Sequence, residues 1–574
     1  MGSFSFKRGV LAALSAGLAI AQTEPDTGFH PDWPRWCGKV YEAGYPAFEP
    51  GGETLEPPTN GSTYLHVQFK PRYSLYLSSE TEASFVVNAA LSPWHGGVYV
   101  NSTTDGVSTD PFTELVFSIN LVDNDMPLVE NRINVNATGV EFAFDLSTLQ
   151  PRLTPYNLVL IGTSVYGDRN YTATGELLYL PDNPAGSATK IDNLKGGLLF
   201  KNAQTGQEFV PLLPYGYYGT YNGSNSTAAS EDFVRNYTSD GTGLNAIISL
   251  ASYADTNPVY DSMDAKGLRF MFDLRGSYKN LTDTAQRVNT IKNHTSLFGY
   301  WTGDEPDGWQ VPFDVTPAAK ALIHQLDPYH PVAVTLNCKD YYFGNYVDGG
   351  DILMEDVYPI AINSTYSKWG TACNATLGDC GCDRCEGTVQ DVSTRLDDLA
   401  RYEAWLGRWP LPKFHNPQVF HGEDYWFRDP TTAEAHVMNA LAFNRGATGI
   451  FGWTWPGSAE LFEAHSQMAA LVTTAPVRDF FLGGGVTRLV VAGYEIVDAA
   501  YWVDGDKMLV SVVNGGYEDI SQSISIPSPV AATGIDSVVF GGLPWEFLGG
   551  SLMVSGLPAM STSFIILNLG TATE

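Results

Sequence analysis

Residues 298–308 read "FGYWTGDEPDG", an apolar and aromatic run that ends in two adjacent acids, Asp304 and Glu305, followed by Pro306. Charges are costly to remove from water, so a buried strand that ends in two acids delivers them either to solvent or to a functional site. The residue before a proline is disfavoured in the helical region of backbone space. We therefore expect an extended Glu305 at the tip of a strand.

Seven further apolar runs lie in the middle of the chain and alternate with helical patterns. They read "FVPLLPYGYYG", "GLNAIISLAS", "GLRFMFDLR", "HPVAVTLN", "DILMEDVYPI", "PQVFHGEDYW" and "ATGIFGWTW". Alternating strands and helices are typical of β-α units around a parallel sheet, and eight such units close a (β/α)8 barrel. The sequence therefore predicts a TIM barrel over residues 206–483.

The regions on both sides of the predicted barrel have a different texture. Residues 60–205 and 484–574 hold short β-rich runs separated by Gly, Pro and Asn turns, a spacing that favours antiparallel β-sandwiches. Residues 22–59 read as an N-terminal extended segment. The predicted fold class is thus multidomain, α/β plus all-β: a central (β/α)8 TIM barrel flanked by N-terminal and C-terminal β-sandwich domains.

The first residues predict export from the cell. Lys7 and Arg8 precede an apolar run that ends in Ala19-Ile20-Ala21, which is typical of a signal peptide over residues 1–21. We expect a secreted, extracellular, monomeric protein that does not enter the membrane. The net charge of −31 argues against nucleic acid and anionic lipid as partners. Eleven sequons predict surface glycosylation, at Asn60, Asn101, Asn136, Asn170, Asn222, Asn225, Asn236, Asn280, Asn293, Asn363 and Asn374.

Six cysteines favour disulfides in an oxidising compartment, although six cysteines allow 15 pairings. The candidates are Cys37, Cys338, Cys373, Cys380, Cys382 and Cys385. The cluster "CNATLGDCGCDRC" has an alternative interpretation as a zinc knot, which its lack of histidine disfavours.

Two strand ends carry the chemistry that we expect. In a (β/α)8 barrel the carboxyl ends of all strands face one rim, where the active site lies. Strand four then ends at Glu305 and strand seven at Glu423, on opposite sides of the barrel. Glycoside hydrolysis needs two opposed carboxyl groups, one to protonate the leaving oxygen and one to attack the anomeric carbon or activate water.

Other predicted rim residues suit a sugar. Carboxylates accept hydroxyl protons and aromatic faces stack on sugar rings, so an acidic, aromatic rim fits a neutral polyol better than a phosphorylated one. The rim shows no His-x-His pair or ligand cluster, so we expect no metal and no cofactor. The candidate substrate-binding residues are Asp304, Asp273, Arg275, Asp356, Tyr358, Tyr217, Trp301, Trp426, Trp453 and Trp455.

From about Phe209 to Gly483 the chain resembles the (β/α)8 glycoside hydrolases of the large retaining clan. Members of that clan carry the acid/base glutamate after strand four and the nucleophile glutamate after strand seven, often with accessory β-sandwiches. The resemblance implies Glu305 as acid/base and Glu423 as nucleophile. The clan usually has asparagine before its acid/base, whereas this chain has Asp304, in a "DEP" form associated with a poorly characterised branch.

Several alternatives stay open at this point. Glu305 also fits a surface acid that begins the next helix. His421 shares a face with Glu423 on the predicted strand seven, while Asp424 faces the other way, and Glu355 and Asp356 alternate in the same manner. The leading hypothesis is a secreted, retaining glycoside hydrolase acting on a wall polysaccharide or its oligosaccharides. The alternative is an inactive barrel that binds carbohydrate, and a metal-dependent hydrolase or deaminase finds little support.

Overall fold

The computed structural model describes most of the chain after the predicted signal peptide. The described residues are 35–40, 42, 44, 51–100, 112–165, 169–221, 226–239, 241–250, 258–362, 365–367, 370–373 and 381–570. The predicted signal peptide over residues 1–21 therefore lies outside them. None of the helices in these ranges is long and apolar enough to cross a membrane.

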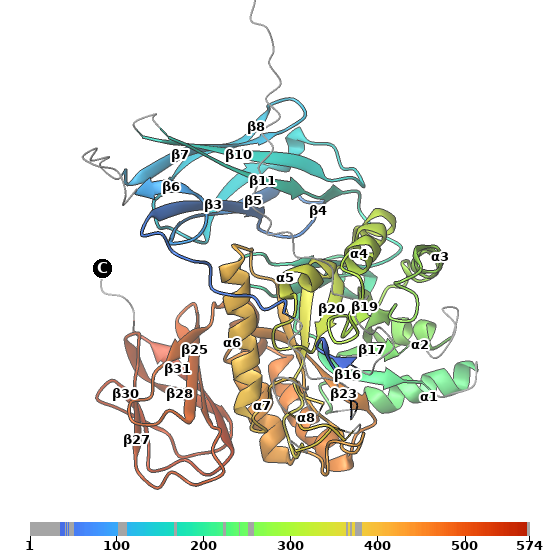
Figure 1. Cartoon of the computed structure of the whole chain (residues 1–574), viewed down its shortest axis with the longest axis vertical. Helices are drawn as coiled ribbons and strands as arrows, with labels where there is room; N and C mark the ends of the chain where they lie inside the picture. The colour runs from blue at the N-terminus through green and yellow to red at the C-terminus, as the bar shows by residue number, and fades with distance from the viewer. Residues whose placement is uncertain are drawn as a thin grey trace, which may run out of the picture.

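Eight parallel strands close a barrel at the centre of the molecule, as the sequence predicts (Figure 1). Each strand pairs with its sequence neighbours, and the first pairs with the last. In chain order they are β16 (Tyr215–Thr220), β17 (Ala246–Leu250), β18 (Arg269–Asp273), β19 (Leu297–Asp304), β20 (Val332–Leu336), β21 (Ile352–Asp356), β22 (Lys413–Asn416) and β23 (Ala447–Trp455).

Helices between the strands pack on the outside of the barrel. Two of them begin at side-chain caps: Thr431 and Glu434 form a capping box before one helix, and Ser458 accepts an N–H of the next. The helices are α1 (Thr227–Tyr237), α2 (Pro258–Lys266), α3 (Leu281–Ile291), α4 (Val315–Leu326), α5 (Phe343–Tyr346), α6 (Gln390–Trp405), α7 (Thr432–Phe443), α8 (Ala459–Val472) and α9 (Val477–Gly483).

The predicted position of strand seven is wrong. The run "PQVFHGEDYW" follows the strand instead of forming it, since β22 ends at Asn416 and Pro417 comes next. Proline has no N–H to donate to a neighbouring strand, which is why the ladder stops there. The residues beyond it resemble a strand in composition because Val419 and Trp426 are buried under the rim loops.

Strand alternation divides the barrel core into two layers. Side chains such as Tyr218, Met271 and Phe414 fill the barrel interior. Their strand neighbours, such as Tyr217 and Phe270, face the helices. This division decides which strand-end residues reach the rim cavity and which do not.

The N-terminal β-sandwich consists of two four-stranded antiparallel sheets and lies at the top of Figure 1. Burial alternates along its strands, as expected when one face packs on the opposing sheet. One sheet has the order β6 (Gly97–Val100), β3 (Thr63–Pro71), β5 (Glu82–Ser92) and β9 (Val140–Asp145); the other has the order β11 (Asn170–Leu177), β10 (Tyr156–Ser164), β7 (Glu114–Leu121) and β8 (Pro127–Asn134).

A three-stranded sheet joins this sandwich to the barrel. It consists of β13 (Ala188–Ile191), β14 (Leu198–Lys201) and β15 (Val210–Leu212). Its Ile191, Leu198, Phe200 and Leu212 belong to the same apolar cluster as the barrel interior. The sheet therefore closes the base of the barrel, opposite the rim.

The C-terminal β domain lies beside α6 and α7 (Figure 1). Met508, Val510 and Ile565 are part of the apolar core between its two sheets. The larger sheet has the order β24 (Thr487–Leu489), β25 (Val497–Asp504), β26 (Lys507–Asn514), β31 (Ser561–Leu569) and β28 (Ala532–Phe540); the smaller has the order β27 (Ile524–Pro527), β30 (Ser551–Val554) and β29 (Glu546–Leu548).

Two disulfides are described, Cys37–Cys338 and Cys382–Cys385. Cys373 is also disulfide-bonded, and Cys380 lies outside the described residues. Sulfurs in disulfides cannot act as thiolate ligands, so these pairings contradict the zinc-knot interpretation. Six predicted glycosylation sites are exposed, at Asn60, Asn136, Asn170, Asn236, Asn280 and Asn293; the other five, Asn101, Asn222, Asn225, Asn363 and Asn374, lie outside the described residues.

Candidate active site

Glu305 follows directly after the last residue of β19, Asp304. Its N–H still donates to the carbonyl oxygen of Thr335 on β20, at 3.0 Å, so the sheet holds it at the rim. Its φ is +51°, which makes the predicted extended conformation wrong. The reason is the tight turn that follows, in which the N–H of Trp309 donates to the Glu305 carbonyl at 3.0 Å. A left-handed residue other than glycine is uncommon and strained, and the exposed Glu423 shares this φ of +51°.

The carboxyl groups of Glu305 and Asp356 lie near each other at the rim, because Asp356, through its charge and hydrogen bonding, contributes to the raised pKa of Glu305. Asp356 is the last residue of β21, so strands four and six bring the two groups together across β20. Burial and the neighbouring acids raise the pKa of Glu305 well above its usual range. Burial and the charge of Asp304 raise the pKa of Asp356 to about 8. Two carboxyls in contact cannot both ionise, so this pair holds a proton at neutral pH.

Asp304 is the third carboxylate of the group and has a cationic partner. The Arg275 guanidinium lies 3.3 Å from Asp304 and 3.1 Å from Asp273. Burial raises the pKa of Asp304 to about 6, although Arg275 opposes this shift. About a third of the side chains of Arg275 and Asp304 is exposed, at 31% and 30%, so this side of the group faces the solvent. Asp304 is therefore the carboxylate that ionises most readily of the three.

Below the carboxylates, polar and aromatic side chains of the barrel interior form a floor. The Nδ2 of Asn416 donates to Asp356 at 2.7 Å and to the hydroxyl of Tyr218 at 2.8 Å. The Nε1 of Trp301 donates to Thr335 Oγ1 at 2.9 Å. Tyr218 packs edge-on against Trp301 and Trp453, with ring centroids 4.8 and 5.2 Å apart. These contacts leave the floor side chains no freedom to rotate away from Asp356.

Asn416 was missed because its strand was misplaced. The signal that identifies it is its position directly before Pro417, at the end of the short run "KFHN". Tyr218, next to the predicted Tyr217, is the residue of this strand that faces the barrel interior.

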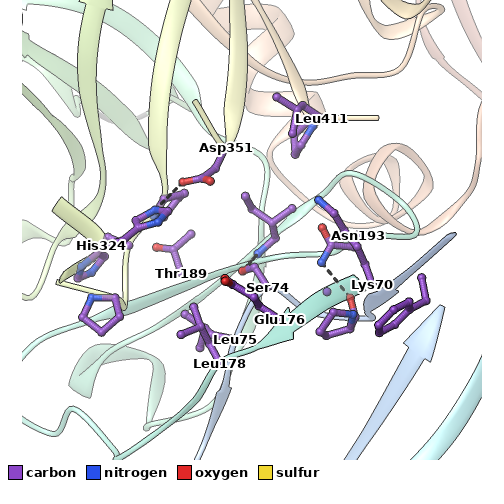
Figure 2. Close-up of a pocket in the computed structure, with 18 of the residues that line it drawn as sticks. Lys70, Ser74, Leu75, Glu176, Leu178, Thr189, Asn193, His324, Asp351 and Leu411 are labelled. Atoms are coloured by element: carbon purple, nitrogen blue, oxygen red, sulfur yellow. Dashed lines mark hydrogen bonds and ion pairs between the residues drawn. The ribbon is translucent and has the colours of Figure 1, made fainter. Parts of the chain in front are cut away.

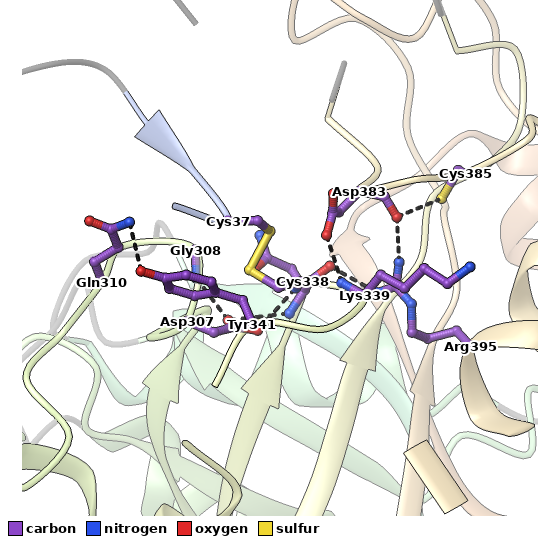
Figure 3. The surroundings of a disulfide bond; sticks show 11 residues. Cys37, Asp307, Gly308, Gln310, Cys338, Lys339, Tyr341, Asp383, Cys385 and Arg395 are labelled. Atoms are coloured by element: carbon purple, nitrogen blue, oxygen red, sulfur yellow. Dashed lines mark hydrogen bonds between the residues drawn. A yellow bond between two sulfur atoms is a disulfide. The ribbon is translucent and has the colours of Figure 1, made fainter. Parts of the chain in front are cut away.

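The turn after Glu305 is tied to the N-terminal segment through Asp307 (Figure 3). The buried Asp307 carboxylate accepts the N–H of Cys338 at 3.0 Å and that of Gly308 at 2.9 Å. Burial raises the pKa of Asp307 to about 7, against these hydrogen bonds. Cys338 is bonded to Cys37, so a disulfide supports the residues that position Glu305.

Tyr358 and Trp426, both predicted as sugar contacts, lie together beside Asp356. The Nε1 of Trp426 donates to the Tyr358 carbonyl at 2.7 Å, and the Tyr358 hydroxyl donates to the Asp356 carboxyl. Phe420 packs edge-on against both rings. Trp426 is only 6% exposed, so it supports Tyr358 from behind instead of presenting a face to solvent.

Tyr217 and Trp455 do not join the group. They face the helices, where Tyr217 packs against Trp455 and Tyr237. A bulge causes the difference between Trp455 and Trp453: from Tyr217 to Gly219, two steps on β16 match three steps on β23. An extra residue reverses the alternation beyond it, so the two tryptophans that share a predicted face lie on opposite faces.

Glu423 is exposed in a turn beyond β22, and the expectation that it ends strand seven is wrong. Asp424 beside it is exposed as well. His421, the alternative on the same run, is paired with Asp429 at 2.8 Å on the surface. The structure thus brings Asp304, Glu305 and Asp356 together, and it places Glu423 outside this buried group.

Glu355 lies on the outer face of β21, away from the rim. Its carboxyl is hydrogen-bonded to Nδ1 of His415 at 2.5 Å. Burial raises the pKa of Glu355 and lowers that of His415 to about 3, so both are neutral at pH 7. The alternation of residues 355 and 356 is therefore resolved with Asp356 on the inside.

Among the described residues, no histidine or cysteine joins the rim carboxylates to form a cluster with metal-ligand spacing. Asp261, Asp264 and His294 approach one another elsewhere, on α2 and in the turn after α3. Arg275 already compensates part of the negative charge that a bound cation would compensate. The donor set at the rim is that of acid–base chemistry.

No family model and no curated protein matches the sequence. Solved structures that share parts of the fold include a Parabacteroides merdae β-glucuronidase, with 12% identity over 88% of this chain and 75% of that chain and a TM-score of 0.34. An Anoxybacillus α-amylase matches with 9% identity over 62% of this chain and 98% of its own, at a TM-score of 0.42. A GH30 endoxylanase from Clostridium papyrosolvens C71 matches with 13% identity over 62% and 96%, at a TM-score of 0.38.

Likenesses this weak assign no activity to the chain. The barrel is established by its own strand pairing, in which eight parallel strands close on themselves between two β-rich regions. The chain has the architecture of a (β/α)8 barrel with flanking β-sandwiches, and its rim carries a group of three carboxyls, of which Asp356 is buried and Asp304 and Glu305 are half-buried.

Proposed function

We propose that this protein is a secreted glycoside hydrolase that cleaves O-glycosidic bonds of a wall polysaccharide or its oligosaccharides. The observation that carries the proposal is the pairing of Glu305 with Asp356, which keeps a protonated carboxyl beside the ionisable Asp304. A protonated carboxyl and a carboxylate at one site are the two groups that glycoside hydrolysis needs.

In the proposed reaction the Glu305–Asp356 pair donates its proton to the glycosidic oxygen as the bond to the anomeric carbon breaks. Asp304, ionised and oriented by Arg275, attacks that carbon and forms a glycosyl-enzyme ester. The pair, now one proton short, then takes a proton from water, whose oxygen attacks the anomeric carbon while the bond from that carbon to Asp304 breaks and the Asp304 carboxylate is released. The anomeric configuration is retained in this sequence, because two displacements occur at the same carbon.

This assignment replaces Glu423 with Asp304 as the nucleophile. The family resemblance implies Glu423, but that side chain is exposed in a turn. A nucleophile needs a fixed position relative to the acid, which Asp304 has through its ion pair with Arg275. Trp453 is partly exposed and supplies aromatic surface for a sugar ring.

The test is turnover of wall glycans and aryl glycosides by the purified protein and four matched variants. We expect Glu305→Gln, Asp356→Asn and Asp304→Asn each to lose about 100-fold or more, in line with removal of a general acid or nucleophile. Glu423→Gln is the control and should stay within about twofold of the wild type. Loss of activity in Glu423→Gln with normal activity in Asp304→Asn would restore the family assignment. Proton NMR of the first product anomer would establish retention.

One observation favours a second candidate, a barrel that binds carbohydrate without cleaving it. Glu305 and Asp356 both have raised pKa values, and protonated carboxyls can hold sugar hydroxyl groups by hydrogen bonds without cleaving a bond. Binding of wall oligosaccharides with no product after prolonged incubation, under conditions where the protein is folded, would support this candidate against the first.

A further inference from the structure

A cavity of about 350 Å³ lies at the opposite end of the barrel, between its base and the N-terminal sandwich (Figure 2). Its walls come from four parts of the chain: the end of β3, the end of β11, strand β13, and the residues that precede β20, β21 and β22. Ligand cavities in proteins usually measure about 300 to 1,000 Å³, so this one has room for a molecule of one sugar ring. None of the rim carboxylates lines it.

Two polar groups in this cavity have no partner in the described part of the chain. The Lys70 ammonium has neither a hydrogen bond nor an ion pair, and its nearest aromatic ring, that of Trp409, is 6.0 Å away. The hydroxyl of Thr189, a residue only 1% exposed, is also unpartnered. Lys70 is half-buried, whereas the Thr189 hydroxyl is a fully buried group, and buried polar groups in native proteins are nearly always satisfied. An unpaired ammonium and an unsatisfied hydroxyl in one cavity indicate a missing ligand.

Asp351 is not that partner. One of its oxygens is 2.9 Å from the Lys320 ammonium, and the other accepts from His324 at 2.8 Å and from the Val332 N–H at 2.9 Å. Its acceptors are thus occupied, and Figure 2 shows Lys70 and Asp351 on different sides of the cavity. The charges of Asp351 and Glu403 act on Lys70 only from beyond ion-pair distance, so no carboxylate of the described residues is in direct contact with its ammonium.

The lining also limits the charge of a ligand. Glu176 and Asp351 both line the cavity with Lys70. Two carboxylates around one ammonium would repel a phosphate dianion but tolerate a single carboxylate placed at Lys70. Thr189 and Glu176 then remain to exchange hydrogen bonds with hydroxyl groups, while Phe69, Leu178 and Ile191 provide apolar surface.

We propose that this cavity is a binding site for a small carboxylated polyol, such as a uronic acid, with its carboxylate on Lys70 and a hydroxyl on Thr189. The site is separate from the rim, so its occupation does not depend on catalysis there. A ligand held between the sandwich and the barrel base would bind only when the two are packed together, and would stabilise that packing by mass action.

The test is calorimetric titration of the whole protein with D-galacturonate and D-glucuronate, beside galactose and glucose of the same size. We expect a uronate to bind at least about tenfold more tightly than the neutral sugars, and Lys70→Met to lose about tenfold or more of that affinity, as when a charge-assisted hydrogen bond is removed. Lys266→Met, at an exposed position outside the cavity, is the matched control and should bind as the wild type does.

Two further variants keep the result interpretable. Thr189→Val removes the hydroxyl at nearly constant volume, so it should lower uronate affinity even if Lys70→Met folds poorly. Glu305→Gln should bind the uronate as tightly as the wild type, which separates this site from the rim. Equal binding of uronates and neutral sugars, full affinity in both cavity variants, or no binding to the wild type would overturn the proposal.

Discussion

Glu305 directly follows β19 and Asp356 ends β21, two strands that are separated in the barrel by β20, yet Asp356 contributes to the raised pKa of Glu305. The backbone of Glu305 is left-handed, and the Asn416 amide donates a hydrogen bond to Asp356. Acid–base sites are often built this way, from titratable groups whose surroundings push their pKa values apart.

The first prediction concerns the pH dependence of kcat/KM. As pH falls through about 6, Asp304 takes up a proton and can no longer attack, so activity should fall on the acid side. As pH rises through about 8, Asp356 and its partner lose the shared proton, so activity should fall on the alkaline side. Initial rates between pH 4 and 10 should therefore give a bell-shaped profile. A profile that stays flat across both values would contradict the assigned roles.

The second prediction is that Asp356→Asn stabilises the protein while it removes activity. The folded pKa of Asp356, about 8, exceeds the ordinary value of 3.8, so the folded state binds more protons than the unfolded state between these values. Stability is thus lost as pH rises through that window. Asparagine mimics the protonated acid and should gain on the order of 1 to 2 kcal/mol at pH 8.

Denaturant unfolding at pH 4 and pH 8 checks this second prediction. The gain should nearly vanish at pH 4, because this pH is close to the ordinary pKa of 3.8 and the folded and unfolded states then differ little in the protons they bind. A variant that is less stable than the wild type at both pH values would mean that Asp356 is held as a carboxylate.

The sequence predicted the barrel because seven of its eight strands are long apolar runs bounded by turn residues. It failed at strand seven because β22 has only four residues, and the loop after Pro417 contains buried apolar side chains that imitate a strand. The error moved the predicted nucleophile to Glu423 and hid Asn416. No local pattern separates a short buried strand from a packed loop.

The site could be predicted only in part, because some of its contacts depend on how distant strands pair. Asp304 and Glu305 could be identified because two charged acids at the end of a buried aromatic run cost free energy of desolvation unless they reach solvent or a functional site. Strand alternation alone could not separate Trp453 from Trp455, since the bulge between β16 and β23 depends on how two distant strands pair. The left-handed backbone of Glu305 is likewise a conformation that Pro306 disfavours rather than predicts.

The third prediction concerns the disulfide between Cys37 and Cys338, which are 301 residues apart in the chain. Replacing both cysteines with alanine should destabilise the protein by about 2 to 4 kcal/mol, because the unfolded chain regains the freedom that the bond removes. Activity should fall as well. The bond anchors the backbone of Cys338, whose N–H donates to Asp307 behind Glu305, and this backbone can move once the bond is removed. Thermal unfolding and kcat of the double variant measure both effects.

The matched control for the third prediction is Cys382 and Cys385, only three residues apart. The bond between these two cysteines closes a loop of only a few residues, so their double alanine variant should lose much less stability. Equal losses in the two double variants would show that the long-range bond has no special role in supporting the rim.

The fourth prediction concerns the attachment of the C-terminal domain to the rim loop. Arg428, in the loop after β22, binds both carboxylate oxygens of the buried Glu434, and the Tyr517 hydroxyl of the C-terminal domain donates to the same carboxylate at 2.6 Å. Arg428 and these hydrogen bonds lower the pKa of Glu434 to about 2 against the effect of burial. Removing the Tyr517 hydroxyl with Tyr517→Phe should cost about 1 kcal/mol at neutral pH.

The pH dependence of that cost follows from the sign of the Glu434 shift. Its folded pKa lies below the ordinary 4.5, so its contribution is complete above pH 4.5 and disappears as pH falls towards 2. Urea unfolding of Tyr517→Phe should therefore show a deficit at pH 7 that narrows at pH 3, whereas Tyr501→Phe, on the same domain, should show none. A deficit that stays constant with pH would mean that Tyr517 acts through ring packing, and the carboxylate would then not be the group that holds the domain to the loop.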